Sequence, residues 1–178
     1  MPNYVALLRG IAPSNPNMRN DKLRGFFENL GFTNVQTVIS SGNVLFETPR
    51  TDMPALEAMI EKALPLQLGF ASTTIIRSRE QLQQLVDRDP FKHAEHNRLT
   101  YLTVTFFKDK PHARLKFPYR PQGKSYELLG MYDQAVCSVV DLTGTKTPDL
   151  MSWLERQYGK QITTRTWQTV GRILKRLD

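Results

Sequence analysis

The sequence predicts an α+β fold whose strands pair in antiparallel sheets, and two observations predict it. Apolar strands and amphipathic helices follow one another in the first half in the order βαββαβ, which is the ferredoxin-like pattern. The second half repeats this order approximately, with one helix eroded, and adds a C-terminal helix. We therefore expect tandem ferredoxin-like subdomains at residues 1–78 and 99–178, joined by a linking helix and loop at residues 79–98.

Each element of the first half follows from its side-chain pattern. Leu23, Phe26 and Phe27 begin an apolar stripe at helical spacing that Gly31 ends, and a second helix keeps such a stripe until Pro65. The expected elements are, in order, a strand at 4–8, a helix capped by Asn17 or Asn20, strands at 35–40 and 43–47, a helix ending at Pro65, and a strand at 70–76.

The strands at 35–40 and 43–47 meet at a polar turn between two apolar runs. A tight hairpin turn needs residues that tolerate a positive φ, and Gly42 and Asn43 are residues of that kind. We expect this hairpin to define the topology of the first subdomain.

The second half begins after a linking helix that a capping box at Ser78 and Gln81 opens. The final helix buries a stripe that includes Trp167, Val170 and Ile173. The expected elements are a strand at 99–107, a short basic helix at 111–117, a hairpin of strands at 125–131 and 134–142, a helix with a Thr147 cap and Pro148 at its first position, a strand at 161–165, and a final helix capped by Thr166.

The composition favours a globular protein, because 40% of residues are hydrophobic and 23% are charged. The single cysteine, Cys137, excludes an internal disulfide and a cysteine metal cage, which fits a reducing compartment. No signal peptide and no membrane-spanning run is evident, so we expect a cytoplasmic protein. The net charge of +7 is concentrated in residues 108–124, with six basic and one acidic side chain, and in residues 160–178, with five and one.

Three motifs carry a family resemblance. They are Leu7-Leu8-Arg9-Gly10-Ile11 at the first strand, Ser41-Gly42-Asn43-Val44-Leu45-Phe46 in the hairpin, and Thr163-Thr164-Arg165-Thr166-Trp167-Gln168-Thr169-Val170 at the last helix. With Leu30-Gly31-Phe32 and Asp89-Pro90-Phe91 between them, the chain resembles the bacterial domain-of-unknown-function 1697 (DUF1697) family over nearly its whole length. The resemblance implies a tandem ferredoxin-like α+β fold. It implies no catalytic or binding residues, because none is established for the family.

The chain departs from the usual family pattern after Ile11. Ala12-Pro13-Ser14-Asn15-Pro16-Asn17 stands where many members have an asparagine and a glycine-rich stretch. Thr166 and Gln168 stand where asparagine is usual around the tryptophan. These departures argue against a flexible glycine loop that cradles phosphate.

Five residues are candidates for a ligand site: Arg9, Ser41, Asn43, Arg165 and Trp167. Arg9 stands where a strand leads through a loop to a helix, a junction that favours anionic ligands. Ser41 and Asn43 offer hydrogen bonds at the hairpin tip, and Trp167 offers a stacking face near Arg165. The structural alternatives are a local ion pair for Arg9, turn chemistry for Ser41 and Asn43, and a core anchor for Trp167.

A second set of candidates is basic and interleaved with aromatic residues, a composition typical of nucleic-acid grooves. The alternatives are a solvated basic face and, in the final helix, cations that complement the helix dipole. The set consists of Lys108, Lys110, Arg114, Lys116, Arg120 and Lys124 in the first basic segment, and Arg172, Lys175 and Arg176 in the final helix.

The pattern predicts no catalytic residue, metal site or cofactor, because His93, Glu95 and His96 lack a further convincing ligand and no nucleophile elbow or phosphate loop occurs. We expect a non-catalytic binding module for an anionic partner, with nucleic acid as one candidate. One alternative is an enzyme acting on a phosphorylated or carboxylated metabolite, with Arg9, Ser41, Asn43 and Arg165 converging in one pocket. The other is a protein-interaction or oligomer-forming module. The sequence leaves the oligomeric state open.

Overall fold

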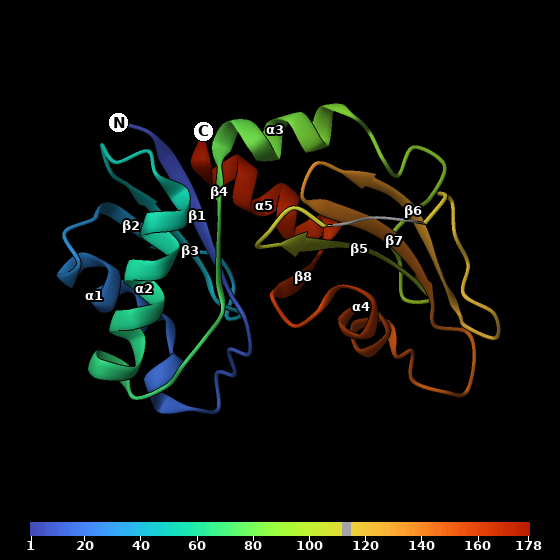
Figure 1. Cartoon of the computed structure of the whole chain (residues 1–178), viewed down its shortest axis with the longest axis horizontal. Coiled ribbons are helices and arrows are strands. Elements are labelled where there is room, and N and C mark those ends of the chain that lie inside the picture. Colours follow the sequence, from blue (N-terminus) through green and yellow to red (C-terminus); the bar gives the residue numbers. More distant parts are fainter. Residues whose placement is uncertain (112–114) are drawn as a thin grey trace. The chain divides into compact units, whose positions relative to one another are not determined.

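The computed structural model describes residues 1–111 and 115–178. These residues form two compact units, one made of Met1–Gln83 with Arg172–Asp178 and the other of Gln84–Gly171 (Figure 1). Each unit holds a four-stranded antiparallel sheet, and the described residues contain five α-helices. The predicted α+β class is therefore confirmed.

The sheet of the first unit has the hydrogen-bonded order β2-β3-β1-β4. Its elements are β1 (Asn3–Leu8), a 3-10 turn (Pro16–Met18), α1 (Asn20–Asn29), β2 (Thr33–Thr37), β3 (Asn43–Glu47), α2 (Met53–Leu68), β4 (Thr74–Ser78), and the beginning of α3 (Arg79–Asp87). The last turns of α5 (Trp167–Leu177) also belong to this unit.

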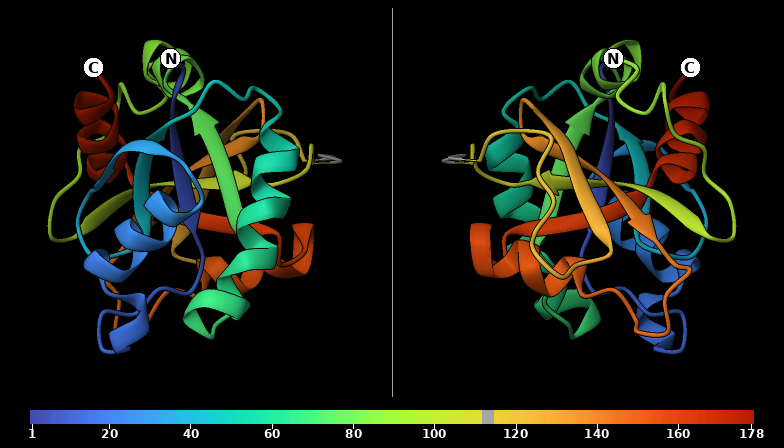
Figure 2. Two further views of the ribbon diagram at one scale, coloured as in Figure 1. Left: turned by 90° about the vertical axis from the view of Figure 1, so that its left-hand side faces the viewer. Right: turned by 90° about the vertical axis from the view of Figure 1, so that its right-hand side faces the viewer.

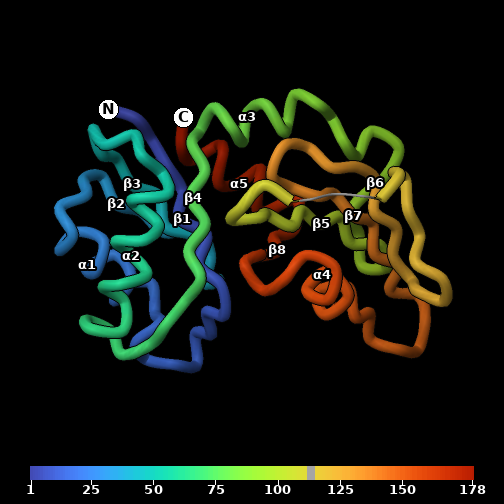
Figure 3. The backbone as a smooth tube through the Cα atoms, in the orientation of Figure 1, coloured from blue at the N-terminus to red at the C-terminus, as the bar shows by residue number. Residues whose placement is uncertain are grey.

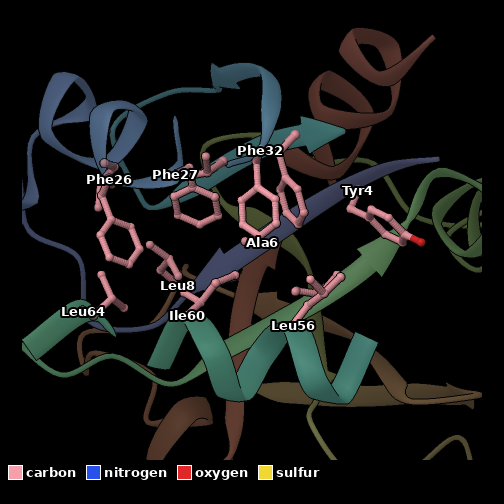
Figure 4. Close-up of a cluster of buried hydrophobic side chains, with 13 residues drawn as sticks. Tyr4, Ala6, Leu8, Phe26, Phe27, Phe32, Leu56, Ile60 and Leu64 are labelled. Carbon is pink, nitrogen blue, oxygen red and sulfur yellow. The ribbon is translucent and has the colours of Figure 1, made fainter. Parts of the chain in front are cut away.

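The core of the first unit lies between its sheet and the helices α1 and α2, which cover one side of the sheet (Figure 2). Side chains alternate along a strand, so Tyr4, Ala6 and Leu8 of β1 point to this side. The ring of Phe27 lies between 5.5 and 5.9 Å from those of Phe26, Phe32 and Phe46. Figure 4 shows Phe26, Phe27 and Phe32 in this cluster. This packing fixes the base of the hairpin between β2 and β3.

The sheet of the second unit has the order β6-β7-β5-β8. Its elements are the end of α3, β5 (Thr100–Phe107), β6 (Tyr126–Tyr132), β7 (Ala135–Asp141), α4 (Leu150–Tyr158), β8 (Ile162–Thr166), and the first residues of α5.

The core of the second unit combines one helix with residues 115–124, a run outside helices and strands that is here called the connecting run. Leu150, Trp153 and Leu154 of α4 are buried against the sheet. Leu115, Phe117 and Tyr119, from the chain between β5 and β6 (traced in Figure 3), pack against the same cluster. The helix predicted at 111–117 includes residues outside the described part of the chain.

The last two residues of β4 and of β8 are an arginine and a hydroxyl residue, namely Arg77 and Ser78 in β4 and Arg165 and Thr166 in β8. After Arg77, the Ser78 Oγ accepts a hydrogen bond from the Gln81 N–H at 3.1 Å, and the Gln81 Oε1 accepts one from the Ser78 N–H at 2.8 Å. After Arg165, the Thr166 Oγ1 accepts from the Thr169 N–H at 3.2 Å. The predicted capping box at Ser78 and the predicted cap at Thr166 are both confirmed.

Three predicted helix boundaries are wrong. Helix α1 begins at Asn20 after Arg19, so neither Asn17 nor Asn20 is its cap. Helix α2 continues through Pro65 to Leu68 and ends at Gly69, whose φ is +77°, because Leu68 still packs against the core. Helix α4 begins at Leu150 and not at Pro148. The residue before it, Asp149, directs its carboxylate to Lys124 and Tyr126 and makes no side-chain capping bond to the helix.

Candidate functional site

The hairpin turn has an unusual backbone. Val38 N–H donates to the Asn43 carbonyl at 3.0 Å, and the positive φ values between them are at Ile39 (+49°) and Gly42 (+81°). Asn43 lies in β3, so the expectation of a positive φ there is wrong and the one at Gly42 is confirmed. A Cβ at position 42 would lie 2.6 Å from Ile11 Cγ1, which leaves room only for glycine.

The polar side chains of the turn serve the turn itself. The buried Asn43 Nδ2 donates to the Val38 carbonyl at 3.0 Å and to the Ser41 Oγ at 2.9 Å. These bonds replace backbone hydrogen bonds that the turn lacks. The ligand-binding role of Ser41 and Asn43 stays a prediction.

Arg9 lies next to this turn in the first unit. The Leu8 N–H donates to the Gly42 carbonyl at 2.9 Å, and the Arg9 N–H donates to the Thr73 carbonyl at 3.0 Å. The Arg9 carbonyl accepts a hydrogen bond from the Ser72 Oγ at 2.7 Å. The structure thus brings Arg9, Ser41 and Asn43 together at one end of the first sheet.

Arg165 and Trp167 belong to the second unit. Arg165 is buried, and its Nη1 donates to the Thr163 Oγ1 at 2.7 Å and to the Thr164 carbonyl at 3.0 Å. Burial lowers the pKa of Arg165 to about 10, so the group remains charged at neutral pH. The half-buried Trp167 packs edge-on against Phe91, with ring centroids 5.0 Å apart. The five predicted ligand residues therefore come from both units.

Two cations of the basic segment 108–124 are paired with carboxylates. Arg120 lies 3.2 Å from Glu127, and Lys124 lies 2.8 Å from Asp149. The Tyr126 hydroxyl donates to the same Asp149 at 2.9 Å. Hydrogen bonds from Lys124 and Tyr126 lower the pKa of Asp149 to about 2. Arg120 and Lys124 therefore each have a carboxylate partner, and Lys124 shares Asp149 with Arg156, which lies 3.6 Å from it.

The other basic residues of that segment differ in exposure. Lys110 and Lys116 are exposed, and Lys108 is half-buried. The prediction for Arg114 lies outside the described residues.

The basic face of α5 has a different setting. Arg172, Lys175 and Arg176 are exposed, whereas Val170, Ile173, Leu174 and Leu177 are buried, which confirms the predicted stripe. With Val38 and Ile39 the three cations line a cavity of 470 Å³, here called the basic groove. Arg176 Nη1 donates to the Gln36 Oε1 at 3.2 Å. The lining contains no carboxylate, and within residues 1–111 and 115–178 neither Arg172 nor Lys175 forms an ion pair.

Sequence reasoning predicted the basic face of α5 and the hairpin separately, and missed that they share a groove. It also missed Ile39, which is 40% exposed and whose carbonyl accepts a hydrogen bond from the Asn20 Nδ2 at 2.9 Å. An isoleucine directly before a polar turn was the available signal. The distance of 140 positions between Arg176 and Gln36 gives no such signal.

The described part of the chain contains no group of three or more His, Cys, Asp or Glu side chains placed to hold a metal ion. Among the helices of this part, none combines the length and apolar character needed to cross a membrane.

The fold defines an α+β protein with two four-stranded antiparallel sheets. Residues 1–136 match the family model described as "Protein of unknown function (DUF1697)", so the chain belongs to this family. A solved structure, that of the conserved bacterial protein SP0830 from Streptococcus pneumoniae, is similar over 99% of both chains, with a TM-score of 0.69 and 18% sequence identity. At this identity the likeness concerns the fold alone. No curated protein matches the chain.

Proposed function

We propose that this protein is a non-catalytic binding module for an anionic partner, and that the partner is a single-stranded nucleic acid held in the basic groove. The observation that carries the proposal is the uncompensated charge of that groove. Three cations line it and no carboxylate does.

The spacing of these cations supports a repeated anion. Positions 172, 175 and 176 are three and four residues apart, so they lie on one face of α5 with Cβ atoms about 5–6 Å apart. Exposed cations without a carboxylate partner attract phosphates and release counterions when they bind. Arg120 and Lys124, by contrast, already have carboxylate partners.

The backbone of Ile39 is a second support. A β-branched residue with positive φ is a genuine outlier, and such strain clusters at binding sites. The strained backbone holds an exposed apolar side chain beside three cations. A nucleic acid strand offers both phosphates for the cations and apolar sugar and base surface for Ile39.

The test is a titration by fluorescence anisotropy of a labelled 12-nucleotide single strand at 50 and 200 mM salt. Three phosphate contacts to a single strand give a slope of about −2 in log K against log salt, or about 20-fold weaker binding at the higher salt. Absence of binding at 50 mM salt overturns the proposal.

A matched pair of variants locates the surface. Arg172→Glu with Lys175→Glu removes two groove cations, and we expect at least about tenfold weaker binding at 50 mM salt. Lys62→Glu with Lys92→Glu makes the same change in net charge at exposed positions outside the groove. Equal losses in the two double variants would show a general charge effect and no specific groove.

We infer further that the fold is a tandem of ferredoxin-like units at residues 1–78 and 99–178, with residues 79–98 between them. The orders β2-β3-β1-β4 and β6-β7-β5-β8 support this, because corresponding strands hold corresponding positions. The register supports it too, since Arg77 pairs with Val5 and Arg165 pairs with Val104. The buried Cys137, with its pKa raised to about 12 by burial, is consistent with a structural thiol in a reducing cytoplasm.

A further inference from the structure

A second, smaller cavity adjoins the basic groove, and Arg176 lines both. This cavity, here called the amide pocket, has a volume of 120 Å³. Its polar lining comes from Asn3, Asn34, Gln36, Glu47, Arg176 and Asp178. The volume is well below the roughly 300 Å³ at which small-molecule sites begin, so the pocket fits one edge of a ligand and not a whole metabolite.

The amide pocket has a defined set of hydrogen-bonding groups. Asn3 Nδ2 donates to the Leu177 carbonyl at 3.2 Å, and Asn34 Nδ2 donates to the Glu47 Oε1 at 3.0 Å. Gln36 uses its oxygen to accept from Arg176 at 3.2 Å.

The groups that have no hydrogen bond within the described chain include the Gln36 amide N–H pair and three acceptors. The acceptors are the side-chain oxygens of Asn3 and Asn34 and the second carboxylate oxygen of Glu47. The pocket therefore presents acceptors beside donors, which include the remaining N–H groups of Arg176.

The charges of the two cavities differ, and this difference orients a ligand. The basic groove contains only cations among its charged residues, whereas the amide pocket contains the carboxylates of Glu47 and Asp178. A phosphate is attracted more strongly to the basic groove than to the amide pocket, where Glu47 and Asp178 offset Arg176 and Asp178 also pairs with Arg79. A nucleotide strand with its phosphates on Arg172 and Lys175 thus directs an uncharged base edge toward the amide pocket, with Arg176 at the junction.

We propose that the amide pocket reads a nucleobase that carries an exocyclic amine, an inference that rests on the proposed binding of single-stranded nucleic acid. Adenine and cytosine each present an amine donor next to a ring-nitrogen acceptor, which fits the Glu47 oxygen and the Gln36 N–H pair. Thymine presents a single imino N–H to the acceptors of the pocket, whereas the amine of adenine or cytosine presents two N–H groups. The pocket consequently favours adenine and cytosine over thymine.

The test compares the affinities of 12-nucleotide oligo(dC), oligo(dA) and oligo(dT) at one salt concentration, together with their salt slopes. We expect oligo(dC) and oligo(dA) to bind at least about fivefold more tightly than oligo(dT), with the same salt slope for all three. Equal affinities with the slope intact overturn the base-reading inference and leave the proposed function standing. Absence of binding by all three overturns both.

Two variants make the test specific. Glu47→Gln keeps the size of the side chain and replaces an acceptor by a donor, so we expect the preference for oligo(dC) over oligo(dT) to fall below twofold without a change in salt slope. The matched control, Glu28→Gln, alters an exposed carboxylate of α1 outside the pocket and leaves the preference unchanged. A preference that survives Glu47→Gln contradicts the inference.

Discussion

The two units share a strand order but cover the corresponding side of the sheet differently. In the first unit α1 and α2 both pack against the sheet, around a cluster of phenylalanine rings. In the second unit α4 is joined by side chains of the connecting run, among them Leu115, Phe117 and Tyr119. This run forms neither a helix nor a strand, although Tyr119 exchanges two backbone hydrogen bonds with Leu128, so side-chain contacts have to hold much of it in place.

The different ways in which the two sheets are covered explain a difference in how the cations of the two units are paired. Lys124, at the end of the connecting run, pairs with Asp149 at the start of α4, and Tyr126 donates to the same carboxylate. These contacts connect the run to the helix. In the first unit Leu177 and the apolar stripe hold α5, and of its cations Arg176 donates to Gln36. The comparison teaches that two cations of the basic segment 108–124 pair with carboxylates, whereas Arg172 and Lys175 form no ion pair within the described residues.

The largest expected effect is a loss of unfolding free energy when a side chain that covers either sheet is truncated. Phe27→Ala removes a fully buried ring among three others and should cost about 3–5 kcal/mol of unfolding free energy. Leu115→Ala removes a half-buried side chain from the connecting run and should cost about 1 kcal/mol of unfolding free energy. Guanidinium denaturation of both variants measures the two values. Similar costs would mean that the run is as much a core element as a helix.

The next effect concerns the carboxylate that connects the run to α4. Asp149→Ala leaves the Tyr126 hydroxyl without its acceptor and should cost about 1–2 kcal/mol at pH 7. The control Glu95→Ala, at an exposed position, should change stability by less than about 0.5 kcal/mol. A loss no larger than that of the control would remove the structural role of Asp149.

The same carboxylate predicts a pH dependence. The pKa of Asp149 is lowered from 3.8 to about 2, so its contribution is complete above pH 4 and is lost as the pH falls toward 2. Between pH 5 and pH 2 the unfolding temperature of Asp149→Ala should therefore fall less steeply than that of the unchanged protein. Parallel curves would contradict this assignment.

The smallest expected loss of unfolding free energy concerns the helix caps that both units have after their fourth strands. Ser78→Ala and Thr166→Ala each remove a helix cap that follows the arginine of a fourth strand, and each should cost about 1 kcal/mol. Thr145→Ala, in an exposed loop, serves as the control in the same denaturation series. A cost at only one of the two caps would break the correspondence between the strand ends.

The parts of the fold that depend on local pattern were predictable from the sequence. Strand alternation, the capping box at Ser78 and the buried stripe of α5 were all predicted, because each is set by neighbours within a few residues. The continuation of α2 past Pro65 was not, because the burial of Leu68 decides it and a local rule points the other way.

The candidate site was less predictable, since long-range contacts determine it. Whether a cation is free depends on partners such as Asp149 for Lys124, 25 positions away, which charge counts cannot show. The strain at Ile39 depends on the turn geometry that Asn43 and Gly42 impose from the far side of the loop.

The central claim is that the uncompensated cations of α5, and not the basic segment of the second unit, bind the anionic partner. The direct measurement is the salt slope of single-strand binding for two neutralised double variants, Arg172→Gln with Lys175→Gln and Lys116→Gln with Arg120→Gln. The account predicts a slope that drops from about −2 to about −0.7 in the first variant and stays near −2 in the second. The opposite result, an unchanged slope in the α5 variant and a reduced slope in the second-unit variant, would contradict it.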